Sequence, residues 1–118
     1  MAEKDELGRR GEQAAADYLI GCGWRILQRN WRCPAGELDI VAHDGTEIVV
    51  VEVKTRRSDL FGHPFEAVDA RKRARLWRLA LAWCTAHPVL ARGTRIRVDA
   101  IALLGTGPFR IEHLRDLR

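Results

Sequence analysis

The sequence predicts an α/β domain in which helices pack against a mixed sheet. Two amphipathic stretches, residues 5–21 and 64–86, have the three- to four-residue period of helices, and the intervening segments alternate as strands do. The order is one helix, three strands, a second helix and two more strands, which is typical of helices covering a sheet. With 118 residues, 47% of them hydrophobic, one domain around one core is expected. The alternating runs are residues 24–31, 36–43, 46–56, 94–104 and 109–113.

The first helix is predicted from a repeat of small and apolar residues that Gly21 and Gly23 end. Glu12 lies on the same side as Ala16 and Leu19, so its carboxylate is expected at the margin of the packed stripe. Two interpretations of Glu12 stay open. It is either a functional carboxylate or a solvated first-turn acid that complements the helix dipole. The stripe consists of Leu7, Gly11, Ala14, Ala15, Tyr18 and Cys22.

The second and third strands are predicted to form a hairpin around Asp44-Gly45, because this dipeptide favours a two-residue turn whose central residues have positive φ. The resulting register sets Asp39 opposite Val50 and Glu37 opposite Glu52. A slip of one residue would move acids into the apolar layer, which argues for this pairing.

The two faces of the hairpin are predicted to differ. One carries three carboxylates and one ammonium, those of Glu37, Asp39, Glu52 and Lys54. Asp39 and Glu52 are expected diagonally, with Cβ atoms roughly 5.5–8 Å apart, close enough to share one cation. A solvated charged face is the ordinary alternative, but these acids stand among long apolar runs, where unpaired charge is costly. The other face carries Leu38, Ile40, Ala42, Val49, Val51 and Val53.

The second helix is expected to start at Pro64 or after an N-cap at Asp69, and to end before Pro88. Lys72 falls within its apolar stripe, four residues after Val68. A lysine there must extend toward solvent or meet a negative partner, and either the acidic cluster or a bound phosphate would serve.

Arginine supplies 17 of the 20 basic residues, and the formal net charge is +4. Guanidinium groups suit bidentate phosphate contacts, although a basic balance alone does not separate nucleic acid from an anionic membrane surface. Arg56 and Arg57 are expected in an irregular surface loop after the acidic cluster. These two arginines and those of the second helix would either contact a phosphate backbone or be solvated. The helix arginines are Arg71, Arg73, Arg75 and Arg78.

The remaining chemistry-bearing residues are expected to be structural. Asp99 lies in the middle of a predicted strand and is expected to be ion-paired. The three cysteines and four histidines show no zinc spacing, which favours free thiols in a reducing compartment. No apolar run approaches about 20 residues and the first residues lack a signal-like core, so a cytoplasmic protein is expected, without a membrane partner.

Glu12 in the first helix, Asp39 on the second strand and Glu52-Val53-Lys54 on the third together resemble the PD-(D/E)xK nuclease superfamily. That superfamily has a restriction-endonuclease-like αβββαβ core, to which this chain would add one C-terminal strand. More closely, the chain is similar to the small YraN-type proteins of bacteria, an uncharacterised family that is similar to archaeal Holliday-junction resolvases. The segments that carry this resemblance are residues 36–42, 51–56, 61–64, 66–68 with Lys72, and 97–99.

The resemblance implies a metal-dependent endonuclease that hydrolyses phosphodiester bonds in structured or branched DNA, with RNA also compatible. Asp39 and Glu52, with the Val53 carbonyl, would hold Mg²⁺ or Mn²⁺. Lys54 would orient the attacking water or stabilise developing charge. Glu12 would bind the metal indirectly or hold a second one. Glu37 replaces the usual proline of the superfamily and would support the site or add a ligand.

Phosphate contacts would come from Lys72, Arg56, Arg57, Arg71 and Arg75 and would not depend on base sequence. Symmetric cutting of a four-way junction would require a homodimer. Trp77, off the main stripe of its helix, is either a contact point for that dimer or plain core. Two alternatives to the nuclease stay open: a protein that binds nucleic acid without cutting it, and an adaptor for another protein.

Overall fold

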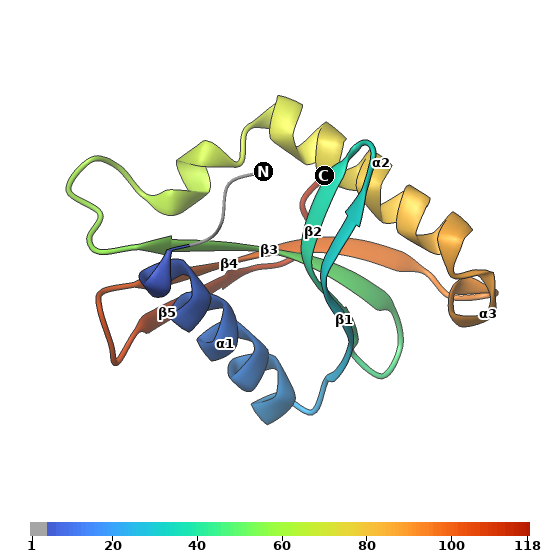
Figure 1. Ribbon diagram of the computed structural model, residues 1–118, viewed down its shortest axis with the longest axis horizontal. Helices are drawn as coiled ribbons and strands as arrows, with labels where there is room; N and C mark the ends of the chain where they lie inside the picture. Colours follow the sequence, from blue (N-terminus) through green and yellow to red (C-terminus); the bar gives the residue numbers. More distant parts are fainter. Residues whose placement is uncertain (1–4) are drawn as a thin grey trace.

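The computed structural model describes residues 5–118 as a five-stranded mixed sheet with one long helix on each face (Figure 1). The sheet order follows the chain from β1 to β5, and only β3 and β4 run parallel. The predicted mixed α/β arrangement, an αβββαβ core with an added C-terminal strand, is confirmed. The elements are α1 (Glu6–Gly21), β1 (Arg25–Cys33), β2 (Gly36–His43), β3 (Ile48–Arg56), η1 (Pro64–Ala67), α2 (Ala70–Ala86), α3 (Pro88–Ala91), β4 (Ile96–Leu104) and β5 (Arg110–Leu114).

Both predicted starts of the second helix are used. Pro64 begins the short 3-10 helix η1, and the Asp69 side chain then caps α2 by accepting a hydrogen bond of 2.9 Å from the Lys72 amide. A capping carboxylate satisfies an amide that has no partner within the helix, and its charge complements the helix dipole. The cap therefore fixes Lys72 in the first turn of α2, over the sheet.

The sheet has a hydrophobic core on each face, as the alternation along its strands requires. In Figure 1, α1 lies below the sheet and α2 above it. The α1 side buries ten hydrophobic residues, which include Leu19, Val51 and Ile101. The α2 side buries twelve, among them Val50 and Trp83. The acids that alternate with these apolar residues therefore lie under a helix and not in open solvent.

Helix α1 approaches β3 closely because Gly11 has no side chain. A Cβ atom at Gly11 would overlap the side chain of Thr55, the residue after Lys54. This close approach brings the first half of α1, with Glu12, against the end of β3.

The predicted register of the β2–β3 hairpin was wrong by two residues. His43 pairs with Ile48 and Val41 with Val50, so residues 44–47 form a four-residue loop in place of a two-residue turn. Asp44 causes this, because its side chain accepts hydrogen bonds from the Thr46 and Glu47 amides, an Asx-type arrangement that lengthens the turn. An even shift leaves the side-chain alternation unchanged, so the predicted face of the acids is retained.

One residue of the predicted apolar face lies elsewhere. Leu38 packs with the α2-side core, whereas Ile40 and Ala42 pack on the α1 side. The β2–β3 ladder extends only to the pair of Ile40 and Val51, while β2 stays paired with β1 as far as Gly36. We infer that the end of β2 follows β1 away from β3, which removes the strict alternation beyond Ile40.

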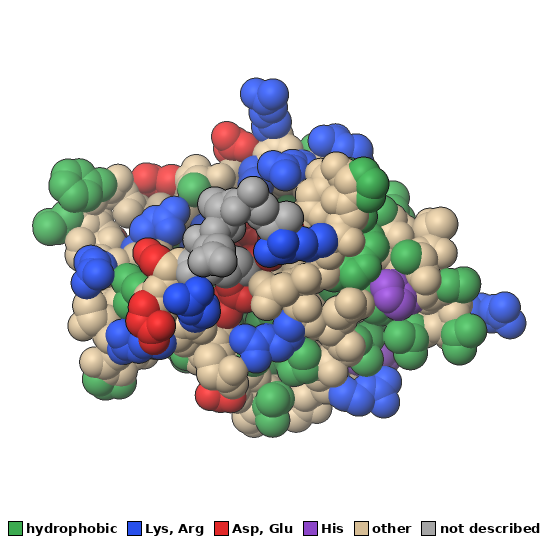
Figure 2. All heavy atoms as spheres, in the orientation of Figure 1, with side chains coloured by type: hydrophobic (Ala, Val, Ile, Leu, Met, Phe, Trp, Pro, Cys, Tyr) green, Lys and Arg blue, Asp and Glu red, His purple; other side chains and the backbone are tan. Residues whose placement is uncertain are grey.

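Other expectations concern surface and termini. Trp77 is half-buried, and its indole Nε1 donates to the Leu117 carbonyl at 2.7 Å, so it fixes the C-terminal segment. Cys22, Cys33 and Cys84 are free thiols. None of the helices within the described chain is both long and apolar enough to cross a bilayer. The loop between β3 and η1 exposes Leu60 and Phe61, and hydrophobic atoms gather at this end of the surface in Figure 2.

Candidate functional site: an acidic pocket beneath helix α2

The site forms where β2 and β3 separate. Beyond the pair of Ile40 and Val51 the backbone ladder stops, and the Asp39 carboxylate takes over the bonding by accepting a hydrogen bond of 2.8 Å from the Val53 amide. Continuing the same register would place Asp39 directly opposite Glu52, not diagonally as predicted. Because the strands separate here, there is room between them. The Val53 amide of β3 therefore donates to the Asp39 side chain in place of a backbone carbonyl of β2.

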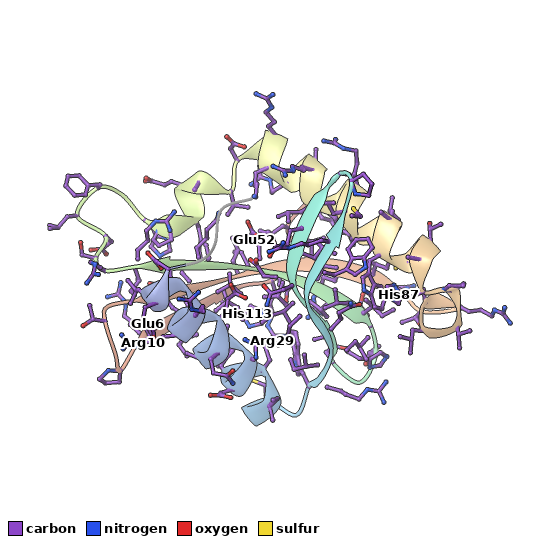
Figure 3. All side chains as sticks on the ribbon, viewed as in Figure 1. Glu6, Arg10, Arg29, Glu52, His87 and His113 are labelled. Atoms are coloured by element: carbon purple, nitrogen blue, oxygen red, sulfur yellow. The ribbon has the colours of Figure 1, made fainter. Side chains whose placement is uncertain are left out.

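Glu52 is the centre of the site. It is only 5% exposed, and its Oε2 atom lies 3.3 Å from the Lys54 ammonium and 3.1 Å from that of Lys72. Its carboxylate also forms a side-chain hydrogen bond with Asp39. Figure 3 shows Glu52 beside β2 and below α2, the helix that supplies Lys72. The predicted negative partner of Lys72 is therefore the acidic cluster.

The balance of charge keeps Glu52 ionised. Burial raises the pKa of Glu52, but the hydrogen bond with Asp39 and the charges of Lys54 and Lys72 outweigh burial and leave the pKa below its ordinary value. The two ammonium groups thus supply positive charge beside the acids within the protein.

These side chains line a pocket of about 270 Å³. It contains three of the predicted acids, and Glu37 is additionally paired with Arg32 at 3.4 Å. Leu76 and Leu79 of α2 form its apolar wall. Its lining residues are Glu37, Asp39, Glu52, Val53, Lys54, Lys72, Arg75, Leu76 and Leu79.

A basic groove continues from the pocket along α2. It has a volume of about 410 Å³, and its cations are the side chains of Arg71, Lys72, Arg75 and Arg78. Lys72 and Arg75 line both the pocket and this groove, so the two adjoin. We call this surface the α2 groove. In Figure 2 basic side chains protrude at the top of the view, where α2 begins, and others are spread over the rest of this face.

Two predicted phosphate contacts lie outside the α2 groove. Arg56 and Arg57 are exposed near the end of β3, and the Arg56 guanidinium donates to the neighbouring Thr55 carbonyl at 2.9 Å. They are not among the residues that line the groove or the pocket. The five predicted cations therefore form two groups, with three on α2 and two at the end of β3.

Glu12 is buried, with 5% exposure, which excludes the fully solvated acid considered from the sequence. It is not one of the side chains that line the acidic pocket. Across residues 5–118, no three histidine, cysteine or acidic side chains are grouped closely enough to hold a metal by themselves. The pocket thus brings together Asp39 and Glu52 of the predicted metal ligands, and Glu12 is not in its lining.

The donor set of the pocket fits a hard divalent cation. Mg²⁺ commonly takes one or two carboxylates and completes its coordination with water and substrate phosphate. Asp39 and Glu52 supply two such carboxylates at the mouth of a groove suited to phosphate. They would hold Mg²⁺ or Mn²⁺ in this arrangement.

One neighbour of the site was missed from the sequence. Arg32 lies directly opposite Glu37 in the β1–β2 hairpin and neutralises it. The signal was present in the sequence: Cys33-Pro34-Ala35-Gly36 is turn-forming, and pairing the two strands outward from it brings these residues together. Glu37 therefore lines the pocket while it is ion-paired with Arg32.

A second buried acid lies on the opposite face of the sheet. Asp99 of β4 is fully buried and accepts hydrogen bonds from the Arg97 guanidinium, the His113 imidazole at 2.8 Å and the Asp116 amide at 2.9 Å. His113 contacts Tyr18 of α1, which places the group on the α1 side. The predicted ion pairing of Asp99 is confirmed.

The chain was compared with known proteins. The model of the uncharacterised protein family UPF0102 matches residues 11–103. A UPF0102 protein of Arthrobacter sp. (strain FB24) is 57% identical over 99% of both chains. The UPF0102 protein of Beutenbergia cavernae is 51% identical, again over 99% of each, and that of Frankia casuarinae is 48% identical over 98% of each.

Proposed function

The chain belongs to the uncharacterised protein family UPF0102, and we propose that it is a metal-dependent endonuclease for structured, branched DNA, of the PD-(D/E)xK kind. The observation that supports this most directly is the placement of Glu52. A buried carboxylate hydrogen-bonds a second carboxyl group, contacts two lysines and lines a pocket that adjoins a basic groove. Metal-dependent hydrolysis of a phosphodiester uses this combination of hard ligands, cations and phosphate contacts.

Each side chain of the pocket has a place in that reaction. Asp39 and Glu52, with the Val53 carbonyl, would hold Mg²⁺ or Mn²⁺, which supplies a Lewis acid for the phosphate and lowers the pKa of a water. The Val53 amide orients the Asp39 carboxylate from the β3 backbone. Lys54, held at 3.3 Å from Glu52, is positioned to orient the attacking water or to stabilise the extra negative charge of the transition state.

The α2 groove would bind the substrate. Its cations, Lys72 and three arginines, line one helix and would contact the sugar-phosphate backbone of either strand without reading bases. Contacts to the sugar-phosphate backbone carry no sequence information, which favours recognition of nucleic-acid structure. Fold and site do not by themselves fix a substrate, so the substrate class is the part of the proposal that needs a direct test.

The test is a cleavage panel. Purified protein is incubated with Mg²⁺ or Mn²⁺ and with four-way junction, flap, single-stranded and duplex DNA, and with RNA. Asp39→Ala serves as the inactive variant, and Asp17→Ala, which removes an exposed acid of α1, serves as the matched control. Cleavage that needs metal, is lost in Asp39→Ala and is kept in Asp17→Ala supports the proposal. Absence of metal-dependent cleavage across the panel contradicts it.

A second candidate is a protein that binds structured nucleic acid without cutting it. The favouring observation is that Lys54 and Lys72 already neutralise Glu52. An ion-pair network of this kind needs no metal. Under this candidate, Asp39→Ala and the wild type would bind junction DNA equally well, and neither would cut it.

A further inference from the structure

Two ammonium groups share one carboxylate oxygen in the acidic pocket, and they differ in what else they can reach. Both Lys54 and Lys72 lie within 3.3 Å of the Glu52 Oε2 atom. Lys54 projects from a strand of the central sheet, and its side chain lines the pocket but not the α2 groove. Lys72 lies in the first turn of α2 and lines the pocket and the α2 groove.

Lys72 has the means to change partner. Its side chain is 30% exposed, against 20% for Lys54, and a lysine is a point charge on a flexible four-carbon stem. Two like charges on one oxygen also repel each other, so the second ammonium is held less favourably than a single one would be. A phosphate that enters the α2 groove offers Lys72 an alternative negative partner.

We propose that Lys72 is a resident counter-ion of Glu52 that transfers to a backbone phosphate when nucleic acid occupies the α2 groove. This inference rests on the proposed function, since it assumes that the acidic pocket binds a divalent cation. While Lys72 contacts Glu52, it competes with that cation for the same carboxylate oxygen. Transfer of Lys72 to phosphate removes the competitor, so nucleic-acid binding strengthens metal binding, and metal strengthens nucleic-acid binding by the same factor.

The consequence is a site that takes up metal poorly in free protein and well on the substrate. A lysine fixed to Glu52 by the fold alone would give no such dependence. The two possibilities differ in whether nucleic acid strengthens metal binding less once the ammonium of Lys72 is removed.

The experiment measures Mn²⁺ binding directly, from the paramagnetic resonance signal of the free ion, for full-length wild type, Lys72→Met and Arg75→Met. Arg75 is the matched control because it also lines both the pocket and the groove but makes no ion pair with Glu52 among those described for residues 5–118. Each protein is titrated alone and with a single-stranded oligodeoxynucleotide at low temperature. The oligonucleotide is checked for integrity on a gel, and its own Mn²⁺ binding is subtracted.

Without the oligonucleotide, Lys72→Met is expected to bind Mn²⁺ more tightly than wild type, on the order of tenfold, and Arg75→Met within about twofold. The oligonucleotide should strengthen Mn²⁺ binding to wild type and to Arg75→Met. In Lys72→Met the oligonucleotide should strengthen Mn²⁺ binding less than in wild type. The difference should equal the factor by which the substitution alone has already tightened Mn²⁺ binding. Lys72→Gln gives a second neutral variant if Lys72→Met does not fold, as judged by circular dichroism.

Three outcomes would overturn the inference. Equal Mn²⁺ affinity of wild type and the neutral Lys72 variants would show that Lys72 does not compete. Equal tightening by Arg75→Met would show a general effect of net charge. Undiminished strengthening by the oligonucleotide in Lys72→Met would show that the coupling runs through another group. Absence of Mn²⁺ binding in every protein is a separate result, and it would contradict the proposed function itself.

Discussion

Asp99 and Glu52 are both buried acids of the central sheet, yet their surroundings differ. Asp99 lies on the α1 side, and its partners are a guanidinium, an imidazole and a backbone amide. Glu52 lies on the α2 side, contacts two lysines and one carboxyl group, and borders a pocket. Figure 3 shows Glu52 and His113, the partner of Asp99, on opposite sides of the sheet.

The difference teaches that burial alone does not separate structural from functional acids. The Arg97 guanidinium is a rigid fork that also binds Asp44 at 3.0 Å and Glu47 at 3.2 Å, so the Asp99 group ties three segments together. Burial lowers the pKa of Arg97, but Asp99 and Asp44 outweigh it and raise that pKa, which keeps Arg97 charged. Under the proposed function, a metal would take the place of Lys72 beside Glu52, whereas the partners of Asp99 would stay in place.

The largest expected effect is on stability and comes from Asp99→Ala. The substitution leaves the Arg97 guanidinium and His113 without their buried partner, and breaking a buried pair typically costs about 3–5 kcal/mol. Urea denaturation followed by circular dichroism measures the change in the free energy of unfolding. A loss below about 1 kcal/mol would contradict the structural role assigned to Asp99.

The next effect is acid destabilisation. Burial raises the pKa of Asp99, but its bonds from His113, Arg97 and the Asp116 amide lower it overall, and the pKa of Glu52 is lowered as well. For an acid whose folded pKa is depressed, the unfolded chain binds more protons between the two values. The stabilisation is therefore complete above about pH 4 and is lost as the pH falls further.

Urea midpoints from pH 2 to pH 7 measure this dependence. Asp99→Asn should flatten the acid limb of the profile more than Glu52→Gln does, because three fixed donors hold the Asp99 carboxylate and none of them can turn to solvent. Equal flattening by both variants would remove the distinction between the two sites.

A smaller change in stability, about 1 kcal/mol or less, is expected from Glu52→Gln. Lys54 and Lys72 are 20% and 30% exposed, so both ammonium groups can reach water when the carboxylate is neutralised. The same variant is expected to lose metal-dependent cleavage. Collapse of the fold in Glu52→Gln would indicate instead that the acidic pocket is a structural network like that of Asp99.

The smallest expected effect is on nucleic-acid binding. Lys72→Ala should weaken binding of single-stranded or duplex DNA and reduce the slope of log K against log salt by about one unit, as expected for the loss of one phosphate contact. Fluorescence anisotropy at several salt concentrations measures the slope. Asp17→Ala is the control and should leave it unchanged.

Much of the fold and part of the site could be predicted from local patterns. Alternation along β2 and β3 gave the face of Asp39 and Glu52. The position of Lys72 in an apolar stripe left extension toward solvent or a negative partner, and Glu52 is that partner. These predictions depend only on the periodicity of helices and strands, which neighbouring segments do not change.

The rest depends on contacts between distant segments. The hairpin register shifted because Asp44 holds a four-residue loop, and Arg97 of β4 binds the Asp44 carboxylate from more than fifty residues away. The place of Leu38 depends on where β2 leaves β3, which the packing of α2 against β2 decides. Whether Glu12 reaches the metal ligands depends on how α1 docks, and helical periodicity contains no information about docking.

The bulge in β1 bears on how two copies of the chain could associate. The β1–β2 register shifts between Ile26 and Gln28, and Asn30 has a positive φ of 53°, so this edge strand is uneven. It also presents Arg25, Arg29 and Arg32 to solvent. Irregular, charged edges prevent a further strand from adding to a sheet. A homodimer that cuts both sides of a junction would therefore have to assemble through another surface, and β1 protects the protein against edge-to-edge aggregation.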